Sequence, residues 1–256
     1  MRLPVVAGNW KMNTTVEEAV ALAGRLRAGL DEIPGVETVV CPPFVSLVAV
    51  KIVIEGSAVR LGAQNMFYQE KGAYTGEISP PMLADLCHYV IIGHSERRQH
   101  FGETDEAVNR KLKAALGIGL KPIFCVGETL DEKEVGGMED VLNRQLTQGL
   151  AGIEDPVGMV IGYEPVWAIG TGRAATGQQA NDTIGFIRRR LAGLYSGETA
   201  DGIRIQYGGS VNADNIAEFV SQPEIDGALV GGTSLKAEQF VSIVRQTAEI
   251  WGRLSA

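Results

Sequence analysis

The chemistry of this chain centres on a carboxylate that is followed directly by a proline. Glu164 ends an apolar run and Pro165 comes next. A residue before proline is held in extended backbone conformations, so the carboxylate has a defined direction. The segment that continues to Gly172 is apolar and rich in glycine, which suits a flap that buries a ligand. A carboxylate under a water-excluding flap is a candidate general base, and we expect burial to raise its pKa.

Other polar residues also follow apolar runs. Asn9 and Lys11 follow the first run, and His94 and Glu96 follow the fourth. Polar groups at the carboxyl ends of parallel strands meet at one edge, so we predict that these four residues join Glu164 in one catalytic centre. For Glu96, an ion pair with the arginines that follow it is an equally open interpretation.

Two glycine pairs follow the seventh and eighth runs. The first is Gly208-Gly209, which continues into Ser210, and the second is Gly231-Gly232. Loops at these positions of a barrel commonly bind phosphate through bare backbone amides and a short helix N-terminus. We therefore predict a phosphate site at these loops, with two ordinary tight turns as the alternative.

The overall charge excludes some partners and leaves a small anion possible. The formal net charge is -8 at pH 7, which argues against binding nucleic acid or an anionic membrane surface. Charges farther away than about 8 Å are largely screened at physiological salt. Lys11 at about 4 Å contributes on the order of 4 kcal/mol at an effective dielectric near 20. One local lysine and several amides can thus attract an anion to a negatively charged protein.

Eight short apolar runs, rich in β-forming residues, recur along the 256 residues. They are Pro4–Gly8, Thr38–Cys41, Val59–Ala63, Tyr89–Gly93, Pro122–Val126, Met159–Gly162, Ile203–Tyr207 and Ala228–Gly231. Strands that alternate with helices predict an α/β fold, a (β/α)8 TIM barrel that forms a single domain over residues 1–256. The alternative is a doubly wound open sheet, but no GxGxxG motif follows the first run.

The segments between the runs have helical spacing and capping signals. Three apolar faces are Ala19, Leu22, Ala23, Leu26 and Leu30; Ala180, Ile184, Ile187, Leu191 and Leu194; and Phe240, Ile243, Val244, Thr247 and Trp251. Thr14 with Glu17, and Thr176 with Gln179, are predicted capping boxes, and Ser79-Pro80 is a predicted helix start.

Three further features bear on location and cofactors. No stretch of 18 apolar residues is present and the N-terminus lacks a signal-peptide pattern. The three cysteines are odd in number and lack CxxC spacing, which fits reduced thiols in the cytoplasm. We also find no metal-ligand cluster, so we expect neither a metal nor a cofactor.

Taken together, these motifs resemble the triosephosphate isomerase family over essentially the whole chain. The matching segments are Ala7–Asn13, Gly62–Asn65, Gly72–Glu77, Ile92–Arg98, Tyr163–Gly172, Tyr207–Val211 and Gly231-Gly232, in that order. The residues that differ from the commonest family wording, Arg173–Ala175 and Gly177, lie in the trailing part of the flap and affect lid details rather than chemistry.

The resemblance implies interconversion of dihydroxyacetone phosphate and glyceraldehyde 3-phosphate, in glycolysis and gluconeogenesis. It implies that Glu164 moves the proton and that a neutral His94 polarises the carbonyl, as is established for the family. It further implies that Lys11 supports the negative charge and Asn9 bonds the substrate oxygen. The phosphate would be held by four residues, which are Gly170, Ser210, Gly231 and Gly232.

The resemblance also implies a homodimer. The stretch from Gln64 to Glu77 is long for a barrel loop, and in the family it docks into a second subunit, with the residue that matches Thr75 reaching the neighbour's active site. Met66, Phe67, Tyr68 and Tyr74 would supply the apolar surface. A loop packed only on its own chain is the alternative. Thermophilic members of the family can be tetramers, and the sequence leaves that state open as well.

Two other functions remain open from the residues alone. A Schiff-base aldolase would need a lysine at the catalytic end of a middle strand, and Lys121 precedes the fifth run instead. A non-catalytic binding protein could retain the barrel, although the set of Asn9, Lys11, His94 and Glu164 argues against it.

Overall fold

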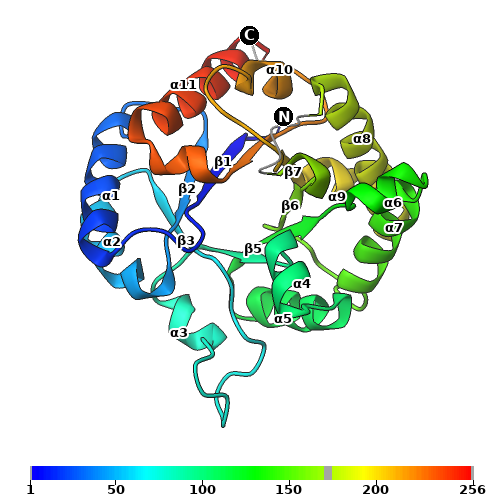
Figure 1. The fold of residues 1–256 in the computed structure, drawn as a ribbon, viewed down its shortest axis with the longest axis horizontal. Coiled ribbons are helices and arrows are strands. Elements are labelled where there is room, and N and C mark those ends of the chain that lie inside the picture. Colours follow the sequence, from blue (N-terminus) through cyan, green and yellow to red (C-terminus); the bar gives the residue numbers. More distant parts are fainter. Residues whose placement is uncertain (1, 170–174, 255–256) are drawn as a thin grey trace.

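Eight parallel strands close into a barrel in the computed structural model, which describes residues 2–169 and 175–254 (Figure 1). The strands are β1 (Val5–Asn9), β2 (Glu37–Cys41), β3 (Arg60–Ala63), β4 (Tyr89–Ile92), β5 (Lys121–Val126), β6 (Val160–Tyr163), β7 (Arg204–Tyr207) and β8 (Gly227–Val230). They pair in sequence order, and β8 closes the barrel onto β1. The predicted (β/α)8 barrel is confirmed, and each of the eight predicted runs matches a strand to within one residue at either end.

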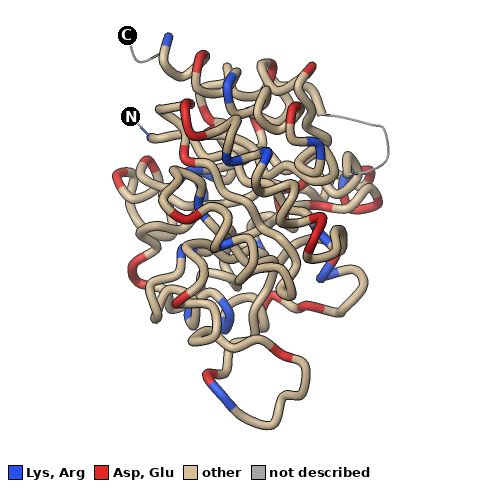
Figure 2. Tube along the Cα trace, turned by 90° about the vertical axis from the view of Figure 1, so that its left-hand side faces the viewer, with Lys and Arg blue, Asp and Glu red and all other residues tan. Residues whose placement is uncertain are grey.

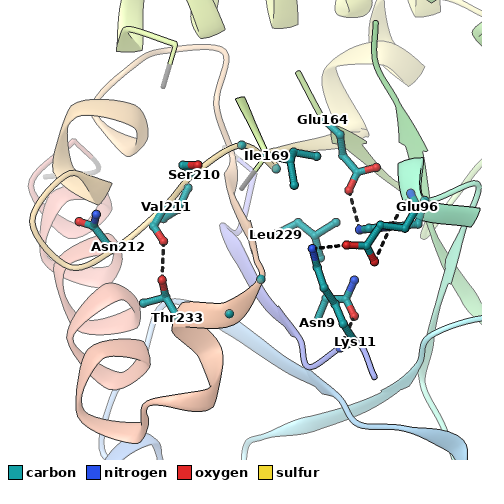
Figure 3. Close-up of a pocket in the computed structure, with 15 residues that line it drawn as sticks. Asn9, Lys11, Glu96, Glu164, Ile169, Ser210, Val211, Asn212, Leu229 and Thr233 are labelled. Carbon is teal, nitrogen blue, oxygen red and sulfur yellow. Dashed lines mark hydrogen bonds and ion pairs between the residues drawn. The ribbon is translucent and has the colours of Figure 1, made fainter. Parts of the chain in front are cut away.

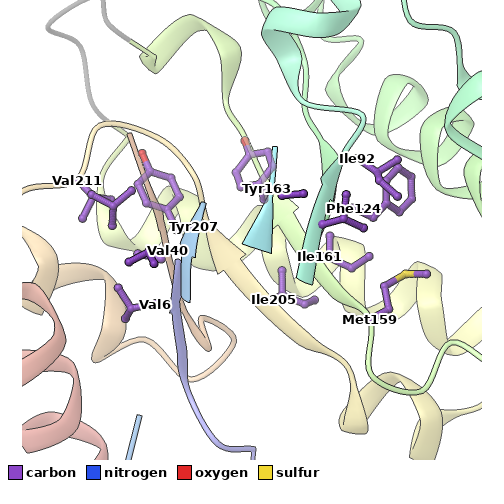
Figure 4. Close-up of a cluster of buried hydrophobic side chains, with 14 of the residues drawn as sticks. Val6, Val40, Ile92, Phe124, Met159, Ile161, Tyr163, Ile205, Tyr207 and Val211 are labelled. Atoms are coloured by element: carbon purple, nitrogen blue, oxygen red, sulfur yellow. The ribbon is translucent and has the colours of Figure 1, made fainter. Parts of the chain in front are cut away.

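Alternate residues of each strand point into the barrel and out toward the helices. In β1, Val5 and Ala7 belong to an inner cluster, whereas Val6 belongs to the outer one. Figure 4 shows part of the outer cluster, where Ile92, Phe124 and Ile161 lie between strands and helices. Both faces of the sheet are therefore buried, one inside the barrel and the other under the helices. Because successive residues point to opposite faces, most strand residues are apolar, and the strands are nearly continuous apolar runs in the sequence.

The helices surround the barrel, as Figure 1 shows. Within the described residues the α-helices are α1 (Val16–Leu30), α2 (Leu47–Ile54), α3 (Pro80–Ala84), α4 (Ser95–Phe101), α5 (Asp105–Gly117), α6 (Leu130–Glu134), α7 (Met138–Gly149), α8 (Gly177–Leu194), α9 (Gly197–Gly202), α10 (Ile216–Val220) and α11 (Ala237–Leu254). Short 3-10 turns are η1 (Phe44–Ser46), η2 (Val166–Ala168) and η3 (Gly232–Leu235). The three predicted apolar faces are buried in α1, α8 and α11, except that Leu194 is 37% exposed.

The predicted cap of α1 is one residue too early. Thr15 caps this helix in a complete box with Glu18, and Thr14 has a φ of 76°, outside the extended conformation of an N-cap residue. The Thr-x-x-Glu pattern occurs twice, one residue apart, and the backbone conformation before the helix allows only the second occurrence to form the capping box. The box of Thr176 with Gln179 is confirmed. Ser79 occupies the N-cap position of α3, but its side chain makes no capping bond.

The connection between β3 and α3, residues 64–79, projects away from the barrel (Figures 1 and 2). The two ends of this loop are joined by a hydrogen bond in which the Phe67 N–H donates to the Ile78 carbonyl at 2.7 Å. Residues 69–77, between these ends, are exposed. Phe67 also stacks on Tyr68 with ring centroids 4.2 Å apart. Met66 is fully buried in its own core, so the expectation that it supplies surface to a partner is wrong.

Each helix in the described ranges is too short or too polar to cross a lipid bilayer. All three cysteines, Cys41, Cys87 and Cys125, are buried free thiols.

Candidate active site

A pocket of about 400 Å³ lies at the carboxyl ends of the strands (Figure 3). It brings together eight of the predicted site residues, which are Asn9, Lys11, His94, Glu96, Glu164, Ser210, Gly231 and Gly232. Gly170, the remaining residue predicted to bind phosphate, lies outside the described residues. The residues come from five loops far apart in the sequence, and barrel closure places them around one space.

Glu164 is held against the wall of this pocket by two donors. The Ser95 N–H donates to Oε2 at 2.9 Å, and His94 Nε2 lies 2.9 Å from Oε1. The residue is only 2% exposed. A Cβ at Gly208 would come within 3.0 Å of Glu164 Cγ, so glycine there leaves room for the carboxylate.

His94 precedes the first turn of α4, and this position determines its tautomer. The Glu96 N–H donates to Nδ1 at 3.2 Å, so Nδ1 is an acceptor without a proton. The proton of the neutral ring therefore sits on Nε2, which faces Glu164. An Nε2–H that points into a pocket can polarise a carbonyl oxygen.

The pKa of Glu164 is lowered from its ordinary value of 4.5, so the predicted rise is wrong. Burial is the largest influence and does raise the pKa. The nearby His94, the Ser95 N–H and Lys11 favour the ionised form, and together they outweigh burial. For the pKa of His94, burial is again the largest influence and lowers it, but the Glu164 and Glu96 carboxylates outweigh burial and raise it above 6.5.

We predict that Glu164→Gln lowers the pKa of His94. The substitution removes the carboxylate that favours the imidazolium, while the burial that disfavours it remains. Titration of the imidazole Cε1 proton by NMR measures the shift, and the exposed His100 serves as the internal control. An unchanged or raised pKa of His94 would contradict the stabilisation of its protonated form by Glu164.

Lys11 reaches the pocket from a strained backbone. Its φ is 52°, a left-handed conformation that non-glycine residues rarely adopt. Asn9 Oδ1 accepts its N–H at 3.0 Å, and Gln64 Nε2 donates to its carbonyl at 2.8 Å.

The ammonium of Lys11 lies 2.6 Å from Glu96 Oε1, and a Cβ at Gly231 would meet Lys11 Cε at 3.5 Å. The cation thus lies between Glu96 and the second glycine pair.

The loops after β7 and β8 are bound to each other. Thr233 Oγ1 donates to the Val211 carbonyl at 2.9 Å, as Figure 3 shows, and Gly232 begins η3. Ser210 Oγ donates to the Ala168 carbonyl at 2.6 Å, which links the first glycine loop to the segment after Glu164. The two glycine pairs therefore line the same side of the pocket, where bare backbone can approach an anion.

Some contacts in the site were not predicted. The Ser95 N–H that holds Glu164 belongs to the backbone, so no residue type reports it, although the helix start beside it was foreseen. Gln64 belongs to the Gly62–Asn65 motif, for which the sequence predicts no role, and its side chain donates to the Lys11 carbonyl. Glu96 pairs with Lys11, not with the arginines that follow it; Arg97 lies near Glu103 instead.

The lysine that an aldolase would need is on the wrong side of the barrel. Lys121 is the first residue of β5, at the mouth opposite the pocket. Lys11 does face the pocket, but it follows β1 and not a middle strand, and its ammonium is paired with Glu96. Among residues 2–169 and 175–254, no three His, Cys, Asp or Glu side chains gather in a way that could hold a metal ion.

Comparison with known proteins identifies the family. The sequence profile of the family described as triosephosphate isomerase matches residues 4–247. A triosephosphate isomerase of Dehalococcoides mccartyi is 58% identical over 251 residues, 98% of this chain and 99% of that protein. The triosephosphate isomerase of Moorella thermoacetica is 56% identical over 95% of this chain and 98% of its own length. That of Carboxydothermus hydrogenoformans is 54% identical over 96% of this chain and 99% of its own length. The chain is therefore an isomerase that belongs to the triosephosphate isomerase family.

Proposed function

We propose that this enzyme interconverts dihydroxyacetone phosphate and D-glyceraldehyde 3-phosphate through an enediolate, in glycolysis and gluconeogenesis. The observation that carries the proposal is the arrangement of Glu164, His94 Nε2 and Lys11 around one pocket with two glycine pairs. A carboxylate base and preorganised donors are what proton abstraction next to a carbonyl needs.

In the proposed reaction, Glu164 leaves the Ser95 N–H and takes a proton from the carbon next to the substrate carbonyl. The electron pair of the broken C–H bond forms the C=C bond of the enediolate, and negative charge gathers on the carbonyl oxygen. His94 Nε2–H, Lys11 and Asn9 stabilise this oxygen. Glu164 then returns the proton to the former carbonyl carbon. The hydroxyl proton of the adjacent carbon passes to the former carbonyl oxygen, with His94 Nε2 as the proton carrier, and this exchanges ketose for aldose. Glu96 is the counter-charge of Lys11 on the same wall.

We assign the phosphate of the substrate to Gly170, Ser210, Gly231 and Gly232. The neighbouring ammonium of Lys11 and the glycine pairs, which line the pocket without side chains, support this assignment. Burial of the substrate also protects the enediolate from phosphate elimination, because water is excluded from the site.

The test is a coupled assay of the pure protein with glyceraldehyde 3-phosphate, followed by NMR of the product formed in D2O. We expect turnover, with deuterium incorporated at the carbon that Glu164 reprotonates. A protein that binds the substrate without turnover would be a binding protein, and a covalent adduct trapped by borohydride would indicate an aldolase.

We further propose that the enzyme acts as a cytoplasmic homodimer. The projecting loop of residues 64–79 carries Thr75 among its exposed residues. Beside Lys11 lies a second cavity of about 470 Å³, and Met12, Phe44 and Phe101 line part of it. These three apolar side chains are 97%, 46% and 68% exposed. A projecting loop and a cavity that is partly lined by exposed apolar side chains, on the same chain, support insertion of each loop into the other copy. The three free thiols fit a reducing compartment.

Thr75→Arg tests the homodimer. We predict that the larger, charged side chain blocks insertion of the loop, so the mass from light scattering falls from two chains to one and kcat falls with it. Thr147→Arg is the matched control, because Thr147 is exposed on α7, away from the loop. A wild-type monomer, or a dimer that tolerates Thr75→Arg, would rule out this interface.

A further inference from the structure

One buried side chain satisfies both polar backbone groups of a single glycine behind the active site. Gln145 on α7 is 4% exposed. Its Oε1 accepts the Gly127 N–H at 2.8 Å, and its Nε2 donates to the Gly127 carbonyl at 3.1 Å. Gly127 follows the last residue of β5. Its backbone therefore takes its position from a side chain on a helix, in addition to the sheet.

Gly127 lies directly against the backbone of Glu164. A Cβ on Gly127 would be 1.7 Å from the Glu164 carbonyl oxygen and 2.6 Å from its carbon, so only glycine fits there. Sheet-like hydrogen bonds flank this contact, from the Glu164 N–H to Val126 at 2.8 Å and from the Val166 N–H to Glu128 at 3.0 Å. A displacement of Gly127 is thus transmitted to the peptide that carries the base.

The surroundings of Gln145 are not tightly packed. Gln145, Gly127 and Glu164 all line a third cavity, of about 530 Å³, on the α7 side of the base. Among the described residues, Glu164 is the one that this cavity shares with the lining of the substrate pocket. Packing alone therefore leaves Gly127 space to shift toward this cavity. The two hydrogen bonds from Gln145 oppose that shift, because a displaced Gly127 would lose the partner of both its N–H and its carbonyl in this part-buried position.

We propose that Gln145 is a positioning residue for the catalytic base, and that it acts on Glu164 through the backbone of Gly127. The inference rests on the proposed function, since it assigns Glu164 as the base. Gln145 does not line the substrate pocket, so its effect is on the alignment of the carboxylate and not on the binding of substrate.

The test compares Gln145→Met with Gln148→Met. Methionine keeps the length of the side chain and removes both hydrogen bonds, and Gln148 is an exposed residue of α7 that borders the same cavity. Because misplacement of a reacting group by about 1 Å costs about 10²-fold in rate, we expect kcat of Gln145→Met to fall roughly 10-fold or more. KM and the dissociation constant of inorganic phosphate should stay within about twofold, and Gln148→Met should match the wild type.

Two further measurements separate positioning from a structural role. A misaligned base slows proton transfer, so the primary deuterium isotope effect on kcat should rise in Gln145→Met. In a double-mutant cycle with Glu164→Asp, the loss from Gln145→Met should shrink, because both changes act on one carboxylate. If Gln145→Met does not fold, as thermal unfolding would reveal, Gln145→Asn takes its place, since its shorter amide cannot make both bonds.

The outcomes also distinguish this inference from the proposed function. Equal kcat in Gln145→Met and Gln148→Met, or strictly additive losses in the cycle, would overturn the role of Gln145 while the wild type remained active. Wild-type protein without isomerase turnover would instead overturn the proposed function.

Discussion

Replacing Glu164 with aspartate is expected to lower kcat on the order of 10²-fold. Aspartate is one methylene shorter, so the carboxylate retracts by about 1 Å from the carbon that we propose it deprotonates, and a displacement of this size has that cost. The backbone cannot advance to compensate, since Gly127 packs against the Glu164 carbonyl. Steady-state kinetics in the coupled assay measure the loss, and KM should change little because binding residues are untouched.

Glu164→Gln sharpens the assignment, because it keeps the shape and removes the basicity. A positioned general base contributes about 10²–10⁴-fold, so we expect a larger loss of kcat than with aspartate. Glu198→Asp, at an exposed position of α9, is the control for the same chemical change elsewhere. Near-wild-type turnover of either Glu164 variant would show that another group takes the proton.

Lys11→Met is expected to lower kcat/KM on the order of 10³-fold. Methionine resembles the stem of lysine without its charge, so the change isolates the electrostatic contribution. A charge at about 4 Å contributes on the order of 4 kcal/mol at an effective dielectric near 20, and each 1.4 kcal/mol is about a tenfold change. KM should rise and kcat should fall, because the ammonium lies near the second glycine pair as well as near the reacting end of the pocket.

The control for Lys11→Met is Lys113→Met, at an exposed position of α5. The Glu96 side chain, whose exposed fraction is 39%, loses its partner in Lys11→Met, but water can solvate it, so we expect the fold to persist. Circular dichroism and light scattering check the fold. A kcat/KM within tenfold of the wild type would mean that the backbone amides alone hold the substrate.

Strands and helices could be predicted because their signals are local. The run around Val90 is apolar throughout since β4 is buried on both faces. Leu22 and Leu26 recur at the spacing of one helix face, and α1 buries that face. The first capping box was misplaced because Thr14 and Thr15 both have a glutamate three residues on, and only the φ of Thr14 distinguishes them.

The membership of the pocket could also be predicted, for a topological reason. In a parallel barrel every strand ends at the same mouth, so polar residues that follow strands must meet there. His94 and Glu164 are 70 positions apart, yet they lie at the ends of β4 and β6 and face each other. Once eight strands are recognised, the positions of these residues in the sequence imply their proximity.

The direction of the Glu164 pKa could not be predicted, because it is a balance between opposing influences. Burial was foreseen and does raise the pKa, but the Ser95 N–H and His94 each lie 2.9 Å from a carboxylate oxygen and reverse the sign. Charge interactions and hydrogen bonds depend steeply on distance, and these distances arise only when β4 and β6 take their places in the barrel.

By itself, the sequence determined the barrel, its eight strand positions and the set of side chains at its mouth, because periodicity and strand ends are written in neighbouring residues. The tertiary structure alone decided which donors hold Glu164, which carboxylate pairs with Lys11, and that Gln145 supports Gly127. These contacts join residues far apart in the chain, and two of the three use backbone groups that every residue possesses. Such groups become specific only when packing brings one donor and one acceptor together.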